Sequence, residues 1–107
     1  MKVLITGATG YIGSALVEYL DSETDYDIIA HCRKLPQYLE SWRSRFSVVE
    51  ADIRDKERLL EVLDPDIDAI IHPAAFNDVD TGQSPKEALE VNGFGTRTIL
   101  EIAEELG

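Results

Sequence analysis

Three glycines with the spacing Gly-x-x-Gly-x-x-Gly lie near the start of the chain. Gly7, Gly10 and Gly13 follow the mostly apolar run Lys2–Thr6 and open a stretch with helical periodicity. Such a loop between a strand and a helix is typical of a dinucleotide site, because the N–H groups and dipole of the first helical turn bind phosphate. We expect Gly7 to permit the tight turn, Gly10 to let the backbone approach a pyrophosphate, and Gly13 to let the helix pack against the strand.

Two cations lie at the end of the next apolar run. Arg33 and Lys34 follow Asp27–Cys32, at the place where an NAD-binding unit usually carries an acidic residue for the ribose 2′-hydroxyl. A guanidinium instead suits a 2′-phosphate, which it binds with two hydrogen bonds. The pattern therefore favours NADP over NAD as the cofactor. The alternative interpretation is a pair of solvated charges on a loop.

A third group of polar residues, Ala51-Asp52-Ile53-Arg54-Asp55, follows the run Phe46–Glu50. In one interpretation Asp52 accepts a hydrogen bond from an adenine amino group and Ile53 packs on the ring. In the other, Asp52 is a turn residue, which is common chemistry for aspartate. Asp55 is predicted to be the N-cap of the helix that follows.

Other reactive residue types have simpler interpretations. Cys32 lacks a matching His and Asn arrangement, so we predict that it is a packing or pocket residue at the end of a strand. His72 is interpreted as a hydrogen-bonded packing residue rather than a catalytic one. Asn77–Asp80 does not complete the spacing of a calcium loop, so it is expected to be a polar loop at the mouth of the site, and no metal site is predicted.

Apolar runs alternate with helical periods along the whole chain. The strands are predicted over residues 2–6, 27–32, 46–50 and 69–72, and the helices over 11–20, 55–63 and 84–106. The segment 33–45 is not assigned, although Pro36 suits the first turn of a short helix. The first helix is expected to bury Ile12, Ala15, Leu16 and Tyr19 on one face. The fourth strand is short and apolar, as expected of a strand buried on both faces.

The last predicted helix has a clear start and a weak middle. Ser84 is a suitable N-cap, Pro85 suits the first helical position, and Glu87 completes a capping box. Gly93 and Gly95 each cost about 1 kcal/mol relative to alanine in a helix interior. This cost indicates close packing or a nearby ligand, and a kink or break at the glycines is the alternative.

Strands that alternate with helices predict an α/β fold with a parallel sheet and right-handed crossovers. We expect one partial dinucleotide-binding domain over residues 1–107, Rossmann-like and doubly wound, with strand order 3-2-1-4 and no further strand. This order places the glycine loop at the switch point between strands 1 and 4. It also leaves strand 4 with an unpaired edge, which invites self-association.

Composition narrows the classes of partner. The chain has 107 residues and a formal net charge of −11, which argues against nucleic acid and anionic membrane surfaces as partners. A single cysteine excludes an intramolecular disulfide and fits a reducing compartment. The sequence shows neither a signal-peptide pattern nor an apolar run long enough to span a membrane. We therefore expect a cytoplasmic location.

These residues together resemble the N-terminal half of an extended short-chain dehydrogenase/reductase, of the NAD-dependent epimerase/dehydratase kind. The resemblance covers essentially the whole chain, and its landmarks are Val3–Gly13, Asp52–Asp55, Ile70–Ala75 and Val91–Thr96. Within the family, the stretch Ala74–Asp80 is most similar to nucleotide-sugar reductases of the dTDP-4-dehydrorhamnose reductase type. UDP-sugar epimerases and dehydratases follow closely.

The resemblance implies a set of site residues. Asn92 matches the helix asparagine that helps to hold the family's active-site water and catalytic lysine. The cofactor-binding residues predicted from the motifs and the resemblance are Gly7, Thr9, Gly10, Tyr11, Ile12, Gly13, Arg33, Lys34, Asp52, Ile53, Ala74 and Ala75.

One part of the family pattern is missing from these residues. The family's chemistry resembles proton transfer by the tyrosine of a Tyr-x-x-x-Lys pair, and no tyrosine here has a lysine four residues on. We therefore expect the NAD(P)-binding part of a nucleotide-sugar reductase, epimerase or dehydratase, without its catalytic pair. The alternatives are a dinucleotide-binding module that does no chemistry, and an interaction fragment that pairs through its open sheet edge.

Overall fold

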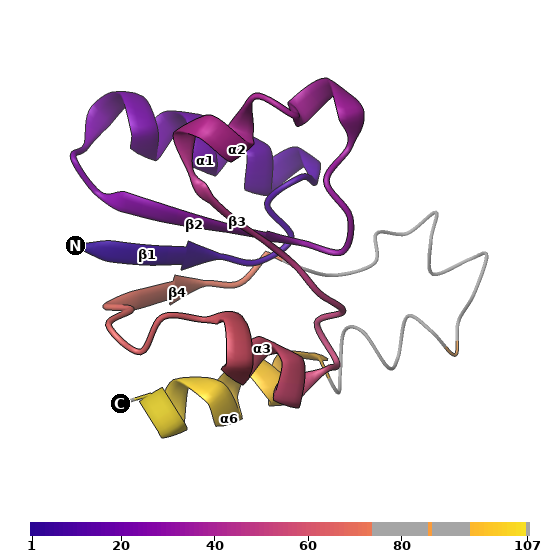
Figure 1. Ribbon diagram of the computed structural model, residues 1–107. Helices are drawn as coiled ribbons and strands as arrows, with labels where there is room; N and C mark the ends of the chain where they lie inside the picture. Colours follow the sequence, from indigo (N-terminus) through magenta and orange to yellow (C-terminus); the bar gives the residue numbers. More distant parts are fainter. Residues whose placement is uncertain (74–85, 87–94, 107) are drawn as a thin grey trace.

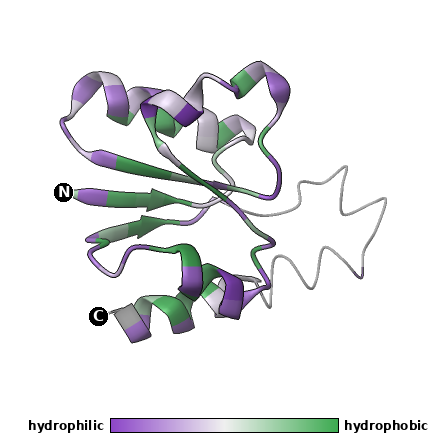
Figure 2. Cartoon of the chain, viewed as in Figure 1, coloured by the Kyte–Doolittle hydropathy of each residue, from purple (hydrophilic) through white to green (hydrophobic). Residues whose placement is uncertain are grey.

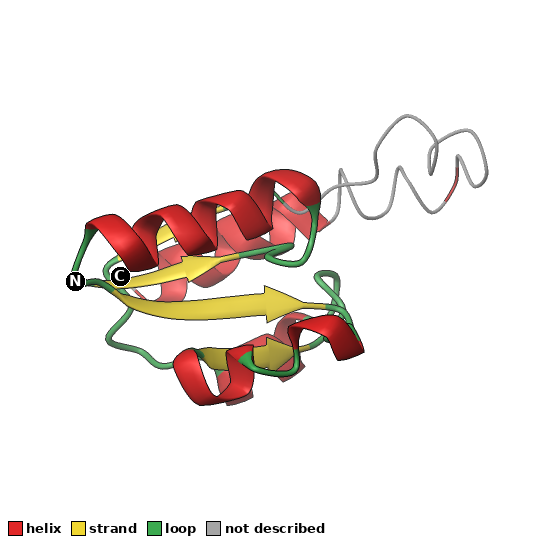
Figure 3. Ribbon diagram, turned by 90° about the horizontal axis from the view of Figure 1, so that it is seen from above, coloured by secondary structure: helices red, strands yellow, loops and turns green. Residues whose placement is uncertain are grey.

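The computed structural model describes residues 1–73, 86 and 95–106 of the chain. Its centre is a four-stranded sheet in the order β3-β2-β1-β4, with the strands labelled in Figure 1. Every pairing is parallel, and the strand arrows visible in Figure 3 point the same way. The strands are β1 (Lys2–Ile5), β2 (Asp27–Cys32), β3 (Ser47–Glu50) and β4 (Ala69–Ile71). The predicted Rossmann-like order 3-2-1-4 is confirmed.

Helices cover both faces of the sheet. In Figure 1, α1 (Tyr11–Glu23) and α2 (Trp42–Arg45) lie above the sheet, and α3 (Lys56–Val62) and α6 (Thr96–Leu106) lie below it. A short 3-10 helix, η1 (Gln37–Leu39), precedes α2. The fold is doubly wound, so all strands end at one edge of the sheet, where the connections into the helices lie.

The alternation of side chains along the strands divides the interior into two cores. Val3 and Ile5 of β1 point to one face and pack with Val17 of α1. Leu4 of the same strand points to the other face and packs with Ile102 of α6. Figure 2 shows the hydrophobic residues concentrated along the strands between these two layers of helices.

The buried face of α1 differs from the predicted one. Ile12 and Tyr19 are 63% and 62% exposed and Ala15 is exposed as well, whereas Leu16 is partly buried against the core as predicted. Gly13 and Val17 are the buried residues of the helix. A Cβ on Gly13 would lie 2.2 Å from the Gly7 carbonyl oxygen, so only a glycine allows the helix this approach. The contact between helix and loop sets the rotation of α1, and the apolar periodicity that includes Ile12 and Tyr19 does not.

The segment that the sequence left unassigned forms η1 and α2, with Pro36 as the N-cap of η1. Trp42 is buried and meets Phe46 edge to face, with ring centroids 5.6 Å apart. Its indole N–H donates to Glu18 of α1 at 3.2 Å. Tertiary contacts of this kind, rather than helical periodicity, hold so short a helix in place.

β4 is less buried than predicted. Ala69 and Ile70 are intermediate, and Ile71 is 36% exposed. Within the described residues β4 pairs only with β1, so it lies at an edge and one side of the strand has no neighbouring strand.

The described part of the last helix, α6, begins at Thr96, and its predicted start at Ser84–Glu87 falls largely outside the described residues. A Cβ on Gly95 would lie 2.7 Å from Cγ2 of Ile53, which confirms close packing as a reason for this glycine. Gly93 lies outside the described residues. None of the described helices is long and apolar enough to cross a membrane.

Candidate dinucleotide-binding site

Each of the three loop positions is a glycine for a different structural reason. Gly7 has a φ of 58°, which residues with a Cβ rarely adopt, so the turn after β1 requires a glycine at this position. Gly13 is required because its missing Cβ makes room for the loop itself, rather than for the strand. At Gly10 the backbone is extended, with φ −73° and ψ 176°, and a Cβ would meet only the Gly7 carbonyl oxygen, at an ordinary 3.4 Å. The described fold therefore tolerates a side chain at Gly10.

The N-terminus of α1 offers hydrogen-bond donors at the loop. Gly10 is the N-cap and makes no side-chain capping bond, and the first turn contains no acidic residue. The Ser14 N–H donates to the Gly10 carbonyl at 2.9 Å, so the amides of residues 11–13 precede the first bond of the helical ladder. Tyr11 and Ile12 beside them are 93% and 63% exposed. Donors with an apolar flank suit a phosphate attached to a larger organic group.

His31, a residue that the sequence analysis did not single out, binds the glycine loop through both its ring and its backbone carbonyl. It is buried at 3% exposure, and its Nδ1 accepts from the Gly7 N–H at 3.2 Å. Its Nε2 therefore carries the hydrogen and donates to the Ala51 carbonyl at 2.9 Å. The His31 carbonyl also accepts from the Ala8 N–H at 2.8 Å. Burial lowers the pKa of His31 below its usual range, which favours the neutral ring that this geometry needs.

His72 contacts the residue that directly precedes the glycine loop. Its Nδ1 is 2.6 Å from Oγ1 of Thr6, and its Nε2 is 3.0 Å from Oγ1 of Thr96. The ring thus links the end of β1 with the start of α6, as predicted for a hydrogen-bonded packing residue. Burial lowers the pKa of His72 as well.

Asp52 lies after β3 and is held by its own turn. Its Oδ1 accepts from the backbone N–H of Arg54 at 2.9 Å, and the Arg54 guanidinium binds both carboxylate oxygens, at 2.9 and 2.6 Å. Chiefly through this guanidinium, the pKa of Asp52 falls from 3.8 to about 2. These bonds confirm the turn interpretation of Asp52, and the adenine contact stays a prediction. Asp55 accepts from the Arg58 N–H at 3.1 Å and caps α3, as predicted.

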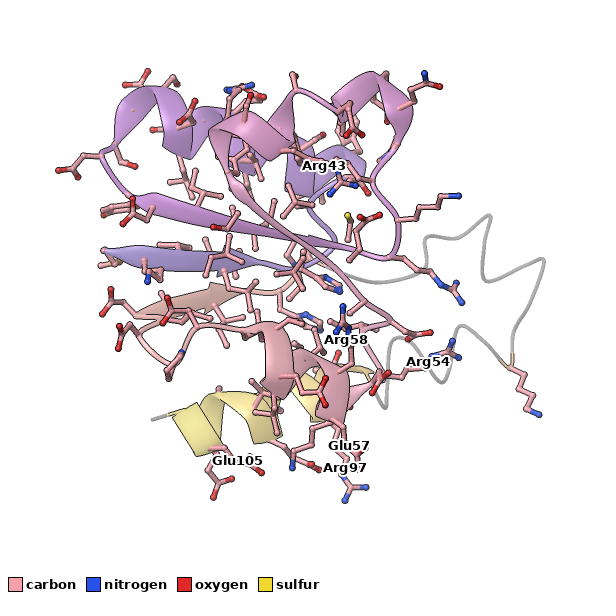
Figure 4. All side chains as sticks on the ribbon, in the orientation of Figure 1. Arg43, Arg54, Glu57, Arg58, Arg97 and Glu105 are labelled. Atoms are coloured by element: carbon pink, nitrogen blue, oxygen red, sulfur yellow. The ribbon has the colours of Figure 1, made fainter. Side chains whose placement is uncertain are left out.

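Two guanidinium groups flank this carboxylate. Nη2 of Arg33, an exposed side chain after β2, lies 3.6 Å from Oδ2 of Asp52. Lys34 is exposed as well. Figure 4 shows Arg54 at the edge of the sheet where the strands end. The ends of β2 and β3 thus bring two guanidinium groups to one carboxylate, because the two strands pair in parallel as far as Cys32 and Glu50.

Two other residues face the interior. Cys32 is buried, and desolvation raises the pKa of its thiol to about 11, so its predicted packing role is confirmed and it is not an activated nucleophile. Ile53 is also buried and packs against Gly95. Its side chain therefore already has a partner within the fold, and its contact with an adenine ring stays a prediction.

The structure brings most of the predicted site residues to the carboxyl edge of the sheet: 7–13 after β1, 33 and 34 after β2, and 52 and 53 after β3. Ala74, Ala75, Asn92 and Asn77–Asp80 lie outside the described residues. A hollow of about 860 Å³ lies at the opposite edge, where Lys2, Asp27 and Ser47 begin the strands, so it is distinct from this site. Within residues 1–73, 86 and 95–106, no group of His, Cys, Asp or Glu is arranged to hold a metal ion.

Known proteins are similar to nearly the whole of this chain. A dTDP-glucose 4,6-dehydratase of Salmonella typhimurium is 34% identical over 98% of this chain and 31% of its own length. An L-threonine dehydrogenase structure from Clostridium difficile matches with a TM-score of 0.84 and 36% identity, over 98% of this chain and 33% of its own. A UDP-glucose 4-epimerase from Brucella ovis, solved in complex with NAD, matches with a TM-score of 0.76 and 28% identity, over 94% and 31%.

The chain spans about a third of the length of these relatives. The model of the NAD dependent epimerase/dehydratase family matches residues 3–107, which include the glycine loop, the segment after β3 and all of the four described strands except Lys2. This match covers nearly the entire sequence, and the chain therefore belongs to the NAD dependent epimerase/dehydratase family.

Proposed function

We propose that these residues form the NAD(P)-binding part of a nucleotide-sugar epimerase, dehydratase or reductase. The observation that carries the proposal is the difference between the three glycines. Gly7 and Gly13 are needed by the fold, whereas Gly10 has neither a positive φ nor a close neighbour that requires it. A glycine that the protein itself does not need, next to the amides of a helix N-terminus, fits the close approach of a pyrophosphate.

The loop supplies binding and orientation. The amides of Gly7, Ala8 and Gly10 donate to His31 Nδ1, the His31 carbonyl and the Gly7 carbonyl, so they hold the loop in shape. The amides at the start of α1 are then the donors that face a phosphate. A nicotinamide dinucleotide carries hydride to and from a substrate carbon. The Tyr-x-x-x-Lys pair that would move the proton in this family does not occur among these 107 residues.

The charges after β2 and β3 support NADP as the cofactor. Arg33 and Arg54 share one carboxylate, that of Asp52, so this group of three keeps a net positive charge next to exposed Lys34. A 2′-phosphate of the adenosine ribose would find two guanidinium groups there, and a 2′-hydroxyl would not need them.

The substrate class rests on the relatives. A dTDP-glucose dehydratase and a UDP-glucose epimerase are among the proteins that this chain resembles, which supports a nucleotide sugar as substrate of the whole enzyme. The finer assignment to the dTDP-4-dehydrorhamnose reductase type depends on Ala74–Asp80, and it stays a prediction, as does the cytoplasmic location.

A fluorescence titration of the chain with NADPH and NADH tests the cofactor site. Gly10→Ala should weaken both dinucleotides by tenfold or more without lowering the unfolding temperature, because its Cβ would occupy space that only a ligand needs. Ala15→Leu, on the exposed side of α1, is the matched control and should leave binding unchanged. Equal affinity of Gly10→Ala and the unmodified chain would refute the proposed site.

The same titration tests the preference for NADP. Arg33→Ala should weaken NADPH binding by about tenfold to a hundredfold and change NADH binding little, because one bond between charged groups contributes about 1.5–3 kcal/mol. Arg58→Ala, which removes an equal charge from α3, is the control. A parallel loss for both dinucleotides in Arg33→Ala would contradict a 2′-phosphate site at Arg33.

A second candidate function rests on the sheet edge. Ile71 is partly exposed on β4, whose far side has no strand among the described residues, so pairing with another chain is favoured there. Ile71→Lys should abolish any concentration-dependent self-association in sedimentation. If the chain associates through this edge and binds neither dinucleotide, the interaction function replaces the proposed one.

A further inference from the structure

The glycine loop depends on a residue outside the loop. His31 accepts the Gly7 N–H on its ring at 3.2 Å and the Ala8 N–H on its carbonyl at 2.8 Å, so it binds two consecutive loop amides. The other ring nitrogen is fixed by the Ala51 carbonyl at 2.9 Å, at the end of β3. The imidazole is therefore a bridge between the loop after β1 and the segment after β3.

We propose that His31 is a positioning residue of the dinucleotide site, which holds the glycine loop in its binding conformation only while its imidazole is neutral. The inference rests on the proposed cofactor function. A protonated imidazole has two donors and no acceptor, so it would point an N–H at the Gly7 N–H and break that bond. The Gly7 turn would then lose its side-chain support, and a ligand would have to order the loop itself.

The surroundings of His31 favour the neutral ring. The ring lies between the β1 loop and the β3 end, and no charged side chain makes a hydrogen bond to it among those described. The charges that act on it are a repulsion from His72, at the end of β4, and an attraction from Asp52, after β3. Asp52 is already bound to Arg54, so it does not supply a close partner for a charged imidazole.

Two substitutions separate the hydrogen bonds from the charge. His31→Leu removes both ring bonds, and we expect it to weaken NADPH binding by about fivefold to a hundredfold at pH 7.5, because the Gly7 N–H of the loop loses its acceptor. His31→Gln places an acceptor and a donor across one atom, as the imidazole does, and does not titrate. We expect His31→Gln to bind within about threefold of the unmodified chain, since its side chain leaves neither the Gly7 N–H nor the Ala51 carbonyl unpaired.

The pH profile is the measurement that a merely structural role would not change. Affinity of the unmodified chain should fall by up to about tenfold for each pH unit below the pKa of His31, relative to His31→Gln. The titration of the ligand's own phosphate is common to both proteins and cancels in this ratio. Ile29→Val, at a buried position two residues earlier on β2, is the control for general destabilisation and should follow the profile of the unmodified chain.

Amide hydrogen exchange tests the bridge without any ligand or substitution. The Gly7 amide should lose protection on acidification, after correction for intrinsic rates, while the Ala8 amide should keep it, because Ala8 donates to a backbone carbonyl. Parallel behaviour of the two amides, or equal pH profiles of the unmodified chain and His31→Gln, would overturn the proposal. If neither dinucleotide binds at any pH, the cofactor function fails, and a selective loss at Gly7 would still establish the bridge.

Discussion

At the scale of single residues, the site is built from side chains that satisfy backbone groups. Asp52 accepts from the Arg54 N–H, Asp55 accepts from the Arg58 N–H, and His31 accepts from the Gly7 N–H. Each bond fixes the start of a turn or helix at the carboxyl edge of the sheet. Asp52, Asp55 and the Gly7 turn are therefore held by bonds within the protein itself.

From the ion pair of Asp52 we predict how the stability of the chain depends on pH. Asp52→Asn keeps an acceptor for the Arg54 N–H but loses the charge, so we expect a loss of about 1 kcal/mol at pH 7. The native pKa lies near 2 and the usual value is 3.8, so this stabilisation is present above pH 3.8 and disappears as the pH falls towards 2. Urea unfolding at pH 7 and pH 2 measures it, with Asp25→Asn as an exposed control. An equal deficit at both pH values would contradict the ion pair.

From the burial of Cys32 we predict how fast its thiol reacts. Its pKa is raised to about 11 and the side chain is buried, so iodoacetamide should modify the folded chain at pH 7.5 at least a hundredfold more slowly than the urea-unfolded chain. Mass spectrometry over time provides the measurement. Comparable rates in the two states would show that the strand end is open.

Sequence patterns predicted those residue roles that depend on neighbours along the chain. The Asp55 cap and the turn at Asp52 follow from residues two and three positions away. The roles of His31 and Arg54 were missed, because His31 binds partners 24 and 20 residues away that only the parallel pairing of β1, β2 and β3 brings together. A polar residue inside an otherwise buried strand was the one available signal for His31.

At the scale of elements, contacts rather than periodicity set the orientation of the helices. The four strands and their order followed from alternation of apolar runs and helical periods, which is a global pattern. The rotation of α1 did not, because it depends on the approach of Gly13 to the loop at a distance that no pattern encodes. The exposed residues Ile12, Ala15 and Tyr19 had been predicted to lie on the buried face of α1.

Gly13→Ala tests what sets the position of α1. The new Cβ would lie 2.2 Å from the Gly7 carbonyl oxygen and 2.9 Å from the Ala8 Cα, both backbone atoms that cannot move aside. We expect a loss of about 3 kcal/mol or more, at the upper end of overpacking costs. Thermal unfolding measures it against Gly10→Ala, whose Cβ meets no such obstacle. Similar unfolding temperatures for the two variants would refute this account of the loop.

Substitutions of Trp42 and its partner Glu18 test which contacts hold α2 in place. The indole is buried against Phe46 and donates to Glu18. Trp42→Phe should cost about 1–3 kcal/mol, because it removes this hydrogen bond and leaves a small cavity. Glu18→Gln, which keeps an acceptor for the indole but weakens the ion pair with Arg45, should cost less. A larger loss in Glu18→Gln would mean that charge, rather than packing, holds α2.

At the scale of the whole molecule, ion pairs join the elements on each face of the sheet. Arg45 of α2 binds Glu18 and Asp21 of α1, and Lys56 of α3 binds Glu101 and Glu105 of α6. Figure 4 shows Arg97 and Glu105 along α6, on the face of the sheet opposite Arg43. Exposed pairs of this kind contribute little individually, so the two cores carry most of the stability.

The response of the whole chain to acid depends on its two histidines. The pKa values of His31 and His72 are lowered from 6.5 by burial, so the unfolded chain takes up these protons at a higher pH than the native chain does. Stability should therefore fall as the pH drops below about 6.5, until the native rings are themselves protonated. The net charge of −11 opposes this trend, because acidification reduces the repulsion between carboxylates. Comparing variants isolates the contribution of the histidines.

Urea midpoints between pH 8 and pH 5 provide the measurement. His31→Gln should lose less stability across this range than the unmodified chain, because a glutamine takes up no proton in either state. Asp25→Asn should lose as much as the unmodified chain, because Asp25 is exposed and is not one of the charges that act on either histidine. If the His31→Gln curve runs parallel to that of the unmodified chain, His31 has the same pKa in the folded and unfolded states. The inference that His31 holds the glycine loop through a buried, neutral imidazole would then be wrong.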